Sequence, residues 1–165
     1  MRLKGVWYKY FVPMRSGGME FMMLKNIPKI LSPDLLKILC EMGHGDEIII
    51  ADGNFPGASH AQRLIRLDGH GVPDVLKAVL ELMPLDTKAD PVHLMEKAPG
   101  DTAETSIWHI YKEILKDHTS TEVHYIERFA FYERAAKSYA VVMTGEAALY
   151  ANIILKKGVI FPDEQ

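Results

Sequence analysis

The chain has 165 residues, of which 48% are hydrophobic and 25% charged, a composition typical of one globular domain with its own core. Its 19 basic and 22 acidic residues give a net charge of -3. The composition therefore has no excess of positive charge that would bind nucleic acid or an anionic membrane surface. A single cysteine excludes an intramolecular disulfide, and no apolar run reaches the roughly 20 residues of a membrane-spanning helix. We therefore expect a cytoplasmic protein that binds neither nucleic acid nor membrane.

Residues 1–22 differ in character from the rest of the chain. They are basic and aromatic, and the run Arg-Ser-Gly-Gly at 15–18 is typical of a flexible join. Lys9 interrupts their apolar run and no small-residue cleavage site follows, so the stretch does not match a secretory signal. We predict an N-terminal extension, which is a tag, a misassigned start or an arm packed on the fold or on a partner. A single domain is predicted over 23–165.

Helices and strands alternate in the pattern that follows. Ser32 as N-cap, Pro33 at the first helical position and Gly43 as the stop predict a helix of about ten residues. The run EIIIA at 47–51 is typical of a strand buried on both faces. Further helices are predicted within 73–83, 106–117 and 129–138, and further strands within 63–67, 92–96, 122–127, 139–144 and 152–157.

Strands separated by helices of this length predict the α/β class, as a three-layer α/β/α single domain with a largely parallel sheet. In open α/β sheets, ligands bind outside the carboxyl ends of the strands. Asp52, Arg128 and the pair Thr144 and Glu146 each follow a predicted strand. The sequence therefore predicts a ligand site at this edge of the sheet.

His44 adds a group that can transfer protons. It follows the predicted helix end, where the negative end of the helix dipole favours the protonated imidazole, and Asp46 and Asp52 act in the same sense. Such a histidine is suited to act as a general acid. Two alternatives stay open, because His44 would also suit capping of its own helix carbonyls and Asp52 would suit ordering the turn that follows it.

The remaining histidines and the cysteine form no recognisable site. His60, His70 and Asp68 lie in polar loops, but no ligand spacing supports a metal ion there, and none is predicted. Cys40 is assigned to the apolar stripe of its helix, since no base is paired with it.

Three segments carry a resemblance that composition and periodicity do not supply. They are EMGHGDEIIIADGNFP at 41–56, RFAFYERA at 128–135 and TGEAALYANIILKKGV at 144–159. Together they resemble the sugar mutarotase family, which comprises bacterial L-fucose mutarotases and D-ribose pyranases, over about Met23 to Ile160. The segment RFAFYERA resembles the fucose branch, whereas the ribose branch tends to have a histidine-containing segment in its place.

The resemblance implies an isomerase that interconverts the α and β anomers of a pyranose such as L-fucose, with His44 as the catalytic proton donor. The general base stays open among a water, Asp52 and a tyrosine hydroxyl, and acid and base suffice without a cofactor. The family also implies a ring-shaped homo-oligomer, commonly a decamer, with sites near the subunit contacts. Competing interpretations are a D-ribose pyranase, a non-catalytic monosaccharide-binding protein and a structural ring protein. The implied substrate contacts are Asp52, Arg128, Tyr150, Ala151 and Asn152.

Overall fold

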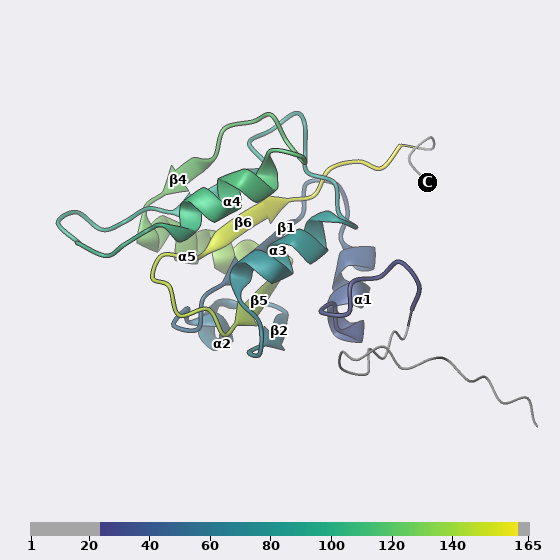
Figure 1. Ribbon diagram of the computed structural model, residues 1–165, viewed down its shortest axis with the longest axis horizontal. Helices are drawn as coiled ribbons and strands as arrows, with labels where there is room; N and C mark the ends of the chain where they lie inside the picture. The colour runs from purple at the N-terminus through teal and green to yellow at the C-terminus, as the bar shows by residue number, and fades with distance from the viewer. Residues whose placement is uncertain (1–23, 162–165) are drawn as a thin grey trace, which may run out of the picture.

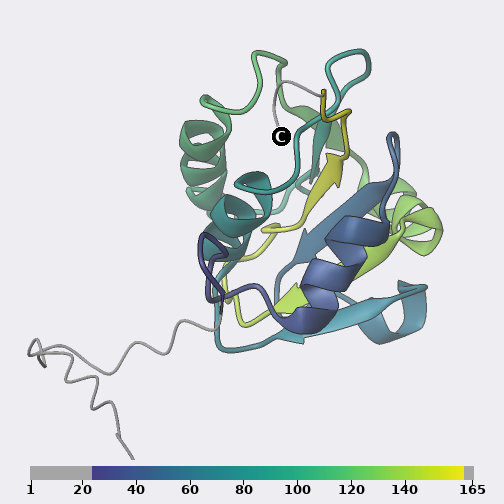
Figure 2. The ribbon, with the colours of Figure 1, turned by 90° about the vertical axis from the view of Figure 1, so that its right-hand side faces the viewer.

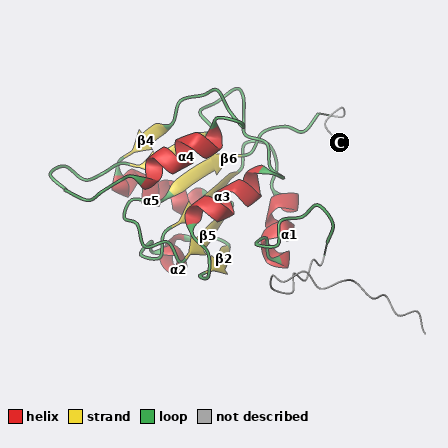
Figure 3. Cartoon of the chain, viewed as in Figure 1, coloured by secondary structure: helices red, strands yellow, loops and turns green. Residues whose placement is uncertain are grey.

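The computed structural model describes residues 24–161, so the predicted extension at 1–22 lies outside the described residues. One sheet carries the fold, and its strands are β1 Glu47–Ala51, β2 Leu64–Leu67, β3 Val92–Met95, β4 His124–Ile126, β5 Ala140–Thr144 and β6 Ile153–Lys156. The helices are α1 Pro33–Glu41, α2 Gly57–His60, α3 Val72–Leu80, α4 Ile107–Leu115 and α5 Arg128–Lys137 (Figure 1; Figure 3). No helix within residues 24–161 has the length and apolarity to cross a membrane.

The helices cover both faces of the sheet, which confirms the predicted α/β/α layers. The larger core joins α1, α3 and α4 to one face, and a smaller core joins α5 to the other (Figure 2). Because side chains alternate along a strand, Ile48 and Ile50 of β1 enter the first core and Ile49 enters the second. All three isoleucines are fully buried, as the run EIIIA predicts.

The strand order is β2-β5-β1-β6-β3-β4, and the sheet is largely parallel, as predicted. Strand β6 is the exception, since it runs antiparallel to both β1 and β3. Residues 145–152 link β5 to β6 without a helix, and such a link cannot make the crossover that a parallel strand needs. The residues that precede β6 therefore meet the residues that follow β1 and β3 at one edge of the sheet.

Helix α1 begins as predicted, because the Ser32 side chain accepts a hydrogen bond from the Leu35 amide at 3.2 Å. Its end differs slightly from the prediction. The helix stops at Glu41 because Met42 is already extended (φ -62, ψ 134), one residue before Gly43.

The assignment of Cys40 to the apolar stripe of α1 is wrong, because its side chain is exposed. The buried positions of α1 are Leu35, Ile38 and Leu39. Cys40 lies one residue beyond Leu39 and therefore about 100° further round the helix, toward solvent.

A charged cluster lies at the amino edge of the sheet, between β1 and α5. The Glu47 carboxylate accepts hydrogen bonds from the Arg134 guanidinium at 2.8 and 2.5 Å. Burial acts to raise the pKa of Glu47, but the hydrogen bond and charge of Arg134 hold it below its usual value. His93, beside them, is 9% exposed, and its buried Nδ1 has no hydrogen-bond partner among the described residues. Burial, followed by the charge of Arg134, lowers the pKa of His93 to about 4.

We expect the free energy of unfolding to fall as the pH drops from about 6.5 to about 4. Unfolded His93 takes up its proton near its ordinary pKa of about 6.5, whereas folded His93 does so near 4. The unfolded state therefore binds more protons in this window. Through His93, acidification to about pH 4 should remove roughly 2 to 3 kcal/mol of the free energy of unfolding. Denaturant titrations at several pH values, on the wild type and on His93→Gln, would measure this slope.

In His93→Gln the slope should flatten, whereas the exposed His109→Gln should keep the slope of the wild type. Glu47, Asp90, His124 and Arg134 also face His93, and all four stay in place in both variants. An unchanged slope in His93→Gln would contradict the assignment.

Candidate functional site

A pocket of about 220 Å³ opens at the carboxyl edge of the sheet, where the sequence predicts a ligand site. Phe55 and Met95 form part of its apolar wall. Seven residues with polar side-chain groups also line it, and they are Asp52, Asn54, Asp101, Arg128, Tyr132, Tyr150 and Asn152. The structure therefore brings together four of the five substrate contacts that the family resemblance implies.

Asp52 directly follows β1 and forms the buried part of this pocket, with 3% of its surface exposed. One carboxylate oxygen accepts from the Asn54 amide at 2.9 Å, so Asp52 does order its turn, as the alternative interpretation proposed. The other oxygen accepts from the Asn152 side chain at 2.9 Å. Burial raises the pKa of Asp52, and the hydrogen bonds from Asn54 and Asn152 oppose that shift.

Asn152 holds Asp52 from both sides, since its own side-chain oxygen accepts from the Asp52 backbone amide at 3.0 Å. This contact exists because Asn152 precedes the antiparallel strand β6. Ala151 is fully buried, and its carbonyl accepts from the Tyr111 hydroxyl at 2.9 Å. Asn152 therefore lines the pocket and holds Asp52 in place, whereas Ala151 lies behind it, and their role as substrate contacts stays a prediction.

Arg128 reaches the pocket from the first turn of α5. The helix begins there because the Glu127 carboxylate accepts from the amides of Phe129 and Ala130 at 2.7 and 3.1 Å. The guanidinium lies 4.8 Å from the centre of the Phe129 ring. Among residues 24–161 no carboxylate forms an ion pair with Arg128. Its donors are therefore available to a ligand with oxygen acceptors.

Tyr150 is held in a left-handed backbone conformation, with φ 58. The indole of Trp108 donates to its carbonyl at 2.8 Å. Its hydroxyl donates to the Asp101 carboxylate and accepts from the Ala98 amide at 3.4 Å. Trp108 and Asp101 were not found from the sequence, because neither follows a strand nor lies in a segment that carries the resemblance.

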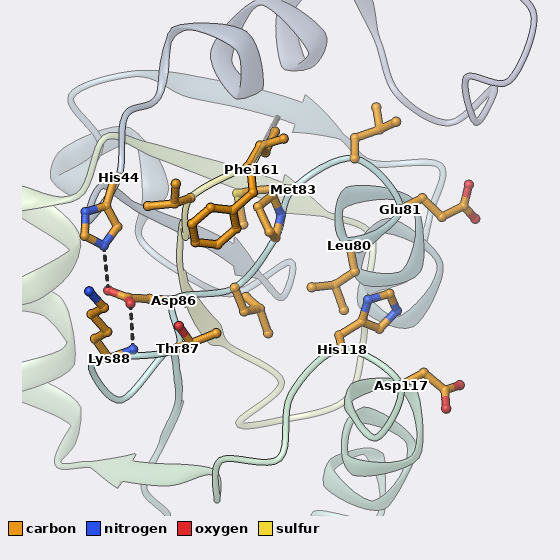
Figure 4. Close-up of a pocket in the computed structure, with 15 residues that line it drawn as sticks. His44, Leu80, Glu81, Met83, Asp86, Thr87, Lys88, Asp117, His118 and Phe161 are labelled. Atoms are coloured by element: carbon orange, nitrogen blue, oxygen red, sulfur yellow. Dashed lines mark hydrogen bonds and ion pairs between the residues drawn. The ribbon is translucent and has the colours of Figure 1, made fainter. Parts of the chain in front are cut away.

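His44 lies at the opposite edge of the sheet from Asp52. It precedes β1, whereas Asp52 follows that strand, and a strand of five residues spans about 17 Å. Within one chain the structure therefore does not bring the predicted acid to the predicted sugar contacts. His44 lines a separate pocket of about 570 Å³, where its Nε2 lies 3.2 Å from the Asp86 carboxylate (Figure 4).

The local partners of His44 also differ from the expectation. The carbonyls at the end of α1 accept from the Lys157 ammonium at 2.7 and 2.6 Å, so Lys157 caps this helix and the capping role of His44 is wrong. The Asp46 carboxylate accepts instead from the Gly43 amide at 2.7 Å. The acid beside His44 is Asp86, which the sequence pattern did not single out.

Asp86 is buried, with 5% of its surface exposed, in the loop that follows α3. Its second carboxylate oxygen accepts from the Lys88 amide at 2.9 Å. That hydrogen bond, aided by the neighbouring His44, lowers the pKa of Asp86. A charged carboxylate thus faces the ring of His44 on one side of the pocket, and Phe161 faces the same pocket (Figure 4).

Two other predicted groups have structural roles. Thr144 does lie at the carboxyl edge, where its hydroxyl donates to the Ala51 carbonyl at 2.8 Å, and Glu146 accepts from the Ala148 amide at 3.0 Å. His60 contacts the ring of Tyr132, with centroids 5.2 Å apart. Within residues 24–161 no group of three or more histidine, cysteine or acidic side chains is arranged to hold a metal ion.

The fold and this site define a single-domain α/β protein with a buried carboxylate, a guanidinium and a phenol around a pocket at the carboxyl edge of its sheet. The model of the RbsD / FucU transport protein family matches residues 25–160. The chain belongs to this family.

The chain resembles proteins named fucose mutarotases and a protein that was solved with D-ribose. A fucose mutarotase of Danio rerio is 50% identical over 149 residues, which cover 86% of this chain and 97% of that protein. The crystal structure of the fucose mutarotase from Streptococcus pneumoniae in complex with L-fucose is 51% identical, with a TM-score of 0.78, and covers 84% of this chain and 100% of its own. Bacillus subtilis RbsD complexed with D-ribose is 26% identical, with a TM-score of 0.68, over 84% of this chain and 100% of its own.

Proposed function

We propose that this chain is a fucose mutarotase, an isomerase that interconverts the α and β anomers of L-fucopyranose. The observation that carries the proposal is the 50% identity to a fucose mutarotase across 97% of that protein. The structure solved with L-fucose is 51% identical to this chain, and the one solved with D-ribose is 26% identical. This difference favours fucose over ribose, which is the second candidate sugar.

The chemistry needs an acid and a base. The anomeric hydroxyl loses its proton while the ring oxygen gains one, the ring opens, the aldehyde turns, and the ring closes on its other face. We assign the protonation of the ring oxygen to His44 and the positioning of the sugar to Asp52 and Arg128. Arg128, with five donors in a fixed plane, suits neighbouring hydroxyl oxygens, and the carboxylate of Asp52 suits a hydroxyl proton.

The separation of His44 from the other groups supports an oligomer as part of this proposal. We propose that the chain assembles into a homo-oligomeric ring, commonly a decamer in this family. In this ring, His44 of one copy would lie at the sugar pocket of another copy and protonate the sugar bound there. Consecutive exposed apolar side chains, Val159 and Ile160, line the pocket of His44, and the exposed Leu149 lines the sugar pocket. Contiguous exposed apolar surface, as at the pocket of His44, is typical of contact surfaces.

Magnetisation transfer between anomers, measured by NMR, tests the activity directly. At catalytic enzyme concentration we expect transfer for L-fucose above the uncatalysed rate, and less for D-ribose, L-rhamnose and D-galactose. Binding of L-fucose without transfer would instead favour a monosaccharide-binding protein. If L-fucose neither binds nor shows transfer, a structural ring protein would be favoured.

A further inference from the structure

The loop between β3 and α4 contributes one charged side chain to the sugar pocket. This loop, residues 96–106, extends from the body of the molecule (Figure 1), and its Asp101 lines the pocket beside Tyr150. One carboxylate oxygen of Asp101 accepts from the Ala103 amide at 2.8 Å, which orders the loop. The other accepts from the Tyr150 hydroxyl. Both oxygens are thus already engaged within the chain.

The hydroxyl of Tyr150 has one proton and two acceptor lone pairs. Its proton is directed to Asp101, and the Ala98 amide nitrogen lies 3.4 Å from the hydroxyl oxygen and donates to one lone pair. Only an acceptor position is left for a ligand in the pocket that Tyr150 lines. The backbone of Tyr150 is held by the Trp108 indole, and its hydroxyl is held by Asp101.

The pKa shifts of Asp101 and Tyr150 agree with a hydrogen bond that the phenol donates and the carboxylate accepts. The bond to Tyr150 lowers the pKa of Asp101, and the same bond raises the pKa of Tyr150. At neutral pH the carboxylate therefore stays charged and the phenol keeps its proton. A phenol that donates to a carboxylate is a better acceptor for a further donor, because hydrogen bonds in a chain polarise one another.

We propose that Asp101 is a positioning residue that accepts the one hydrogen bond that the Tyr150 hydroxyl can donate, so that Tyr150 receives a hydrogen bond from a sugar hydroxyl. The inference rests on the proposed function, because it assigns a sugar to this pocket. Arg128 then supplies donors to the sugar and Tyr150 supplies an acceptor. A pocket with both kinds of group can hold a hydroxyl through its proton and through its oxygen.

Two substitutions separate this role from a structural one. In Asp101→Asn, the amide oxygen can still accept from Ala103, while the amide nitrogen would donate to Tyr150 and turn the phenol proton toward the sugar. In Tyr150→Phe, the ring and the backbone contact of Trp108 remain, and only the hydroxyl is lost. We expect each to raise the KM for L-fucose roughly three- to tenfold, the size of one hydrogen bond, with a smaller change in kcat.

The double variant gives the decisive comparison. Because Asp101 acts through the Tyr150 hydroxyl, adding Asp101→Asn to Tyr150→Phe should change KM by less than about twofold. Multiplied effects, or an unchanged KM in Asp101→Asn alone, would overturn the inference. Tyr139→Phe is the matched control, because its hydroxyl also donates to a carboxylate, that of Glu41 at 3.1 Å, away from the pocket.

A second readout does not depend on the sugar. In a spectrophotometric titration of the tyrosines, Asp101→Asn should lower the pKa of one phenol, and that phenol should be missing in Tyr150→Phe. If the wild type exchanges no sugar, the proposed function fails, and this titration still decides the contact between Asp101 and Tyr150. An unchanged titration in Asp101→Asn would overturn the inference whatever the activity.

Discussion

Replacement of His44 by alanine is expected to reduce the exchange of L-fucose anomers about 10²- to 10⁴-fold, the contribution of a positioned proton donor. Binding of L-fucose should persist, because the polar groups assigned to hold the sugar lie at the opposite edge of the sheet from His44 within each chain. The loss should therefore fall on kcat, with little change in KM. NMR magnetisation transfer measures the rate, and calorimetry measures the binding of L-fucose.

His118→Ala is the matched control, because His118 lines the same pocket as His44 and is exposed. We expect its exchange rate to stay within about twofold of the wild type, since a second histidine at the pocket has no assigned proton transfer. Near-normal exchange in His44→Ala would remove His44 from the mechanism. An equal loss in both variants would indicate damage to the pocket instead of loss of the acid.

Mixed oligomers extend the same prediction. A copy with His44→Ala keeps an intact sugar pocket, and a copy with Arg128→Ala keeps an intact acid. If His44 of one copy serves the pocket of another, mixing the two inactive variants during assembly should restore part of the exchange. Activity that stays at the level of the separate variants would mean that each pocket depends on its own His44.

The parts of the fold that the sequence predicted are those set by neighbouring residues. Ser32 and Pro33 define the start of α1 through contacts within one turn, and the run of isoleucines in β1 is buried because the strand lies at the centre of the sheet. Asp52 and Arg128 were predicted at the pocket because each follows a strand, and parallel strands end at the same edge.

The parts that were not predicted depend on contacts between distant residues. Asp86 meets His44 across 42 residues, and Lys157 reaches the end of α1 across more than a hundred. Asn152 lines the pocket as predicted, but its hydrogen bond to Asp52 was not predicted, because that pair forms only where β6 runs antiparallel to β1. Spacing along the chain carries no record of such pairs, so only the folded structure shows them.

Phe131→Ala is expected to lower the free energy of unfolding by about 3 to 5 kcal/mol, the usual cost of removing a buried aromatic ring. Phe131 lies on the buried face of α5, and the centre of its ring lies 6.0 Å from that of Phe55, which lines the sugar pocket. The loss is a large share of the roughly 5 to 15 kcal/mol that stabilises a domain. Because α5 also carries Arg128, a shift of this helix should raise the KM for L-fucose as well.

Phe129→Ala on the same helix is the comparison, since that side chain is 61% exposed. It should cost less than about 1 kcal/mol, the size of an exposed contact between an aromatic ring and a guanidinium. Denaturant titrations at one fixed protein concentration measure both variants, because assembly would otherwise shift the apparent stability. Similar losses in the two variants would mean that α5 is held as much by its exposed face as by its buried one. A large difference would show instead that the Phe131 ring, packed between α5 and the sheet, fixes the helix that delivers Arg128 to the pocket.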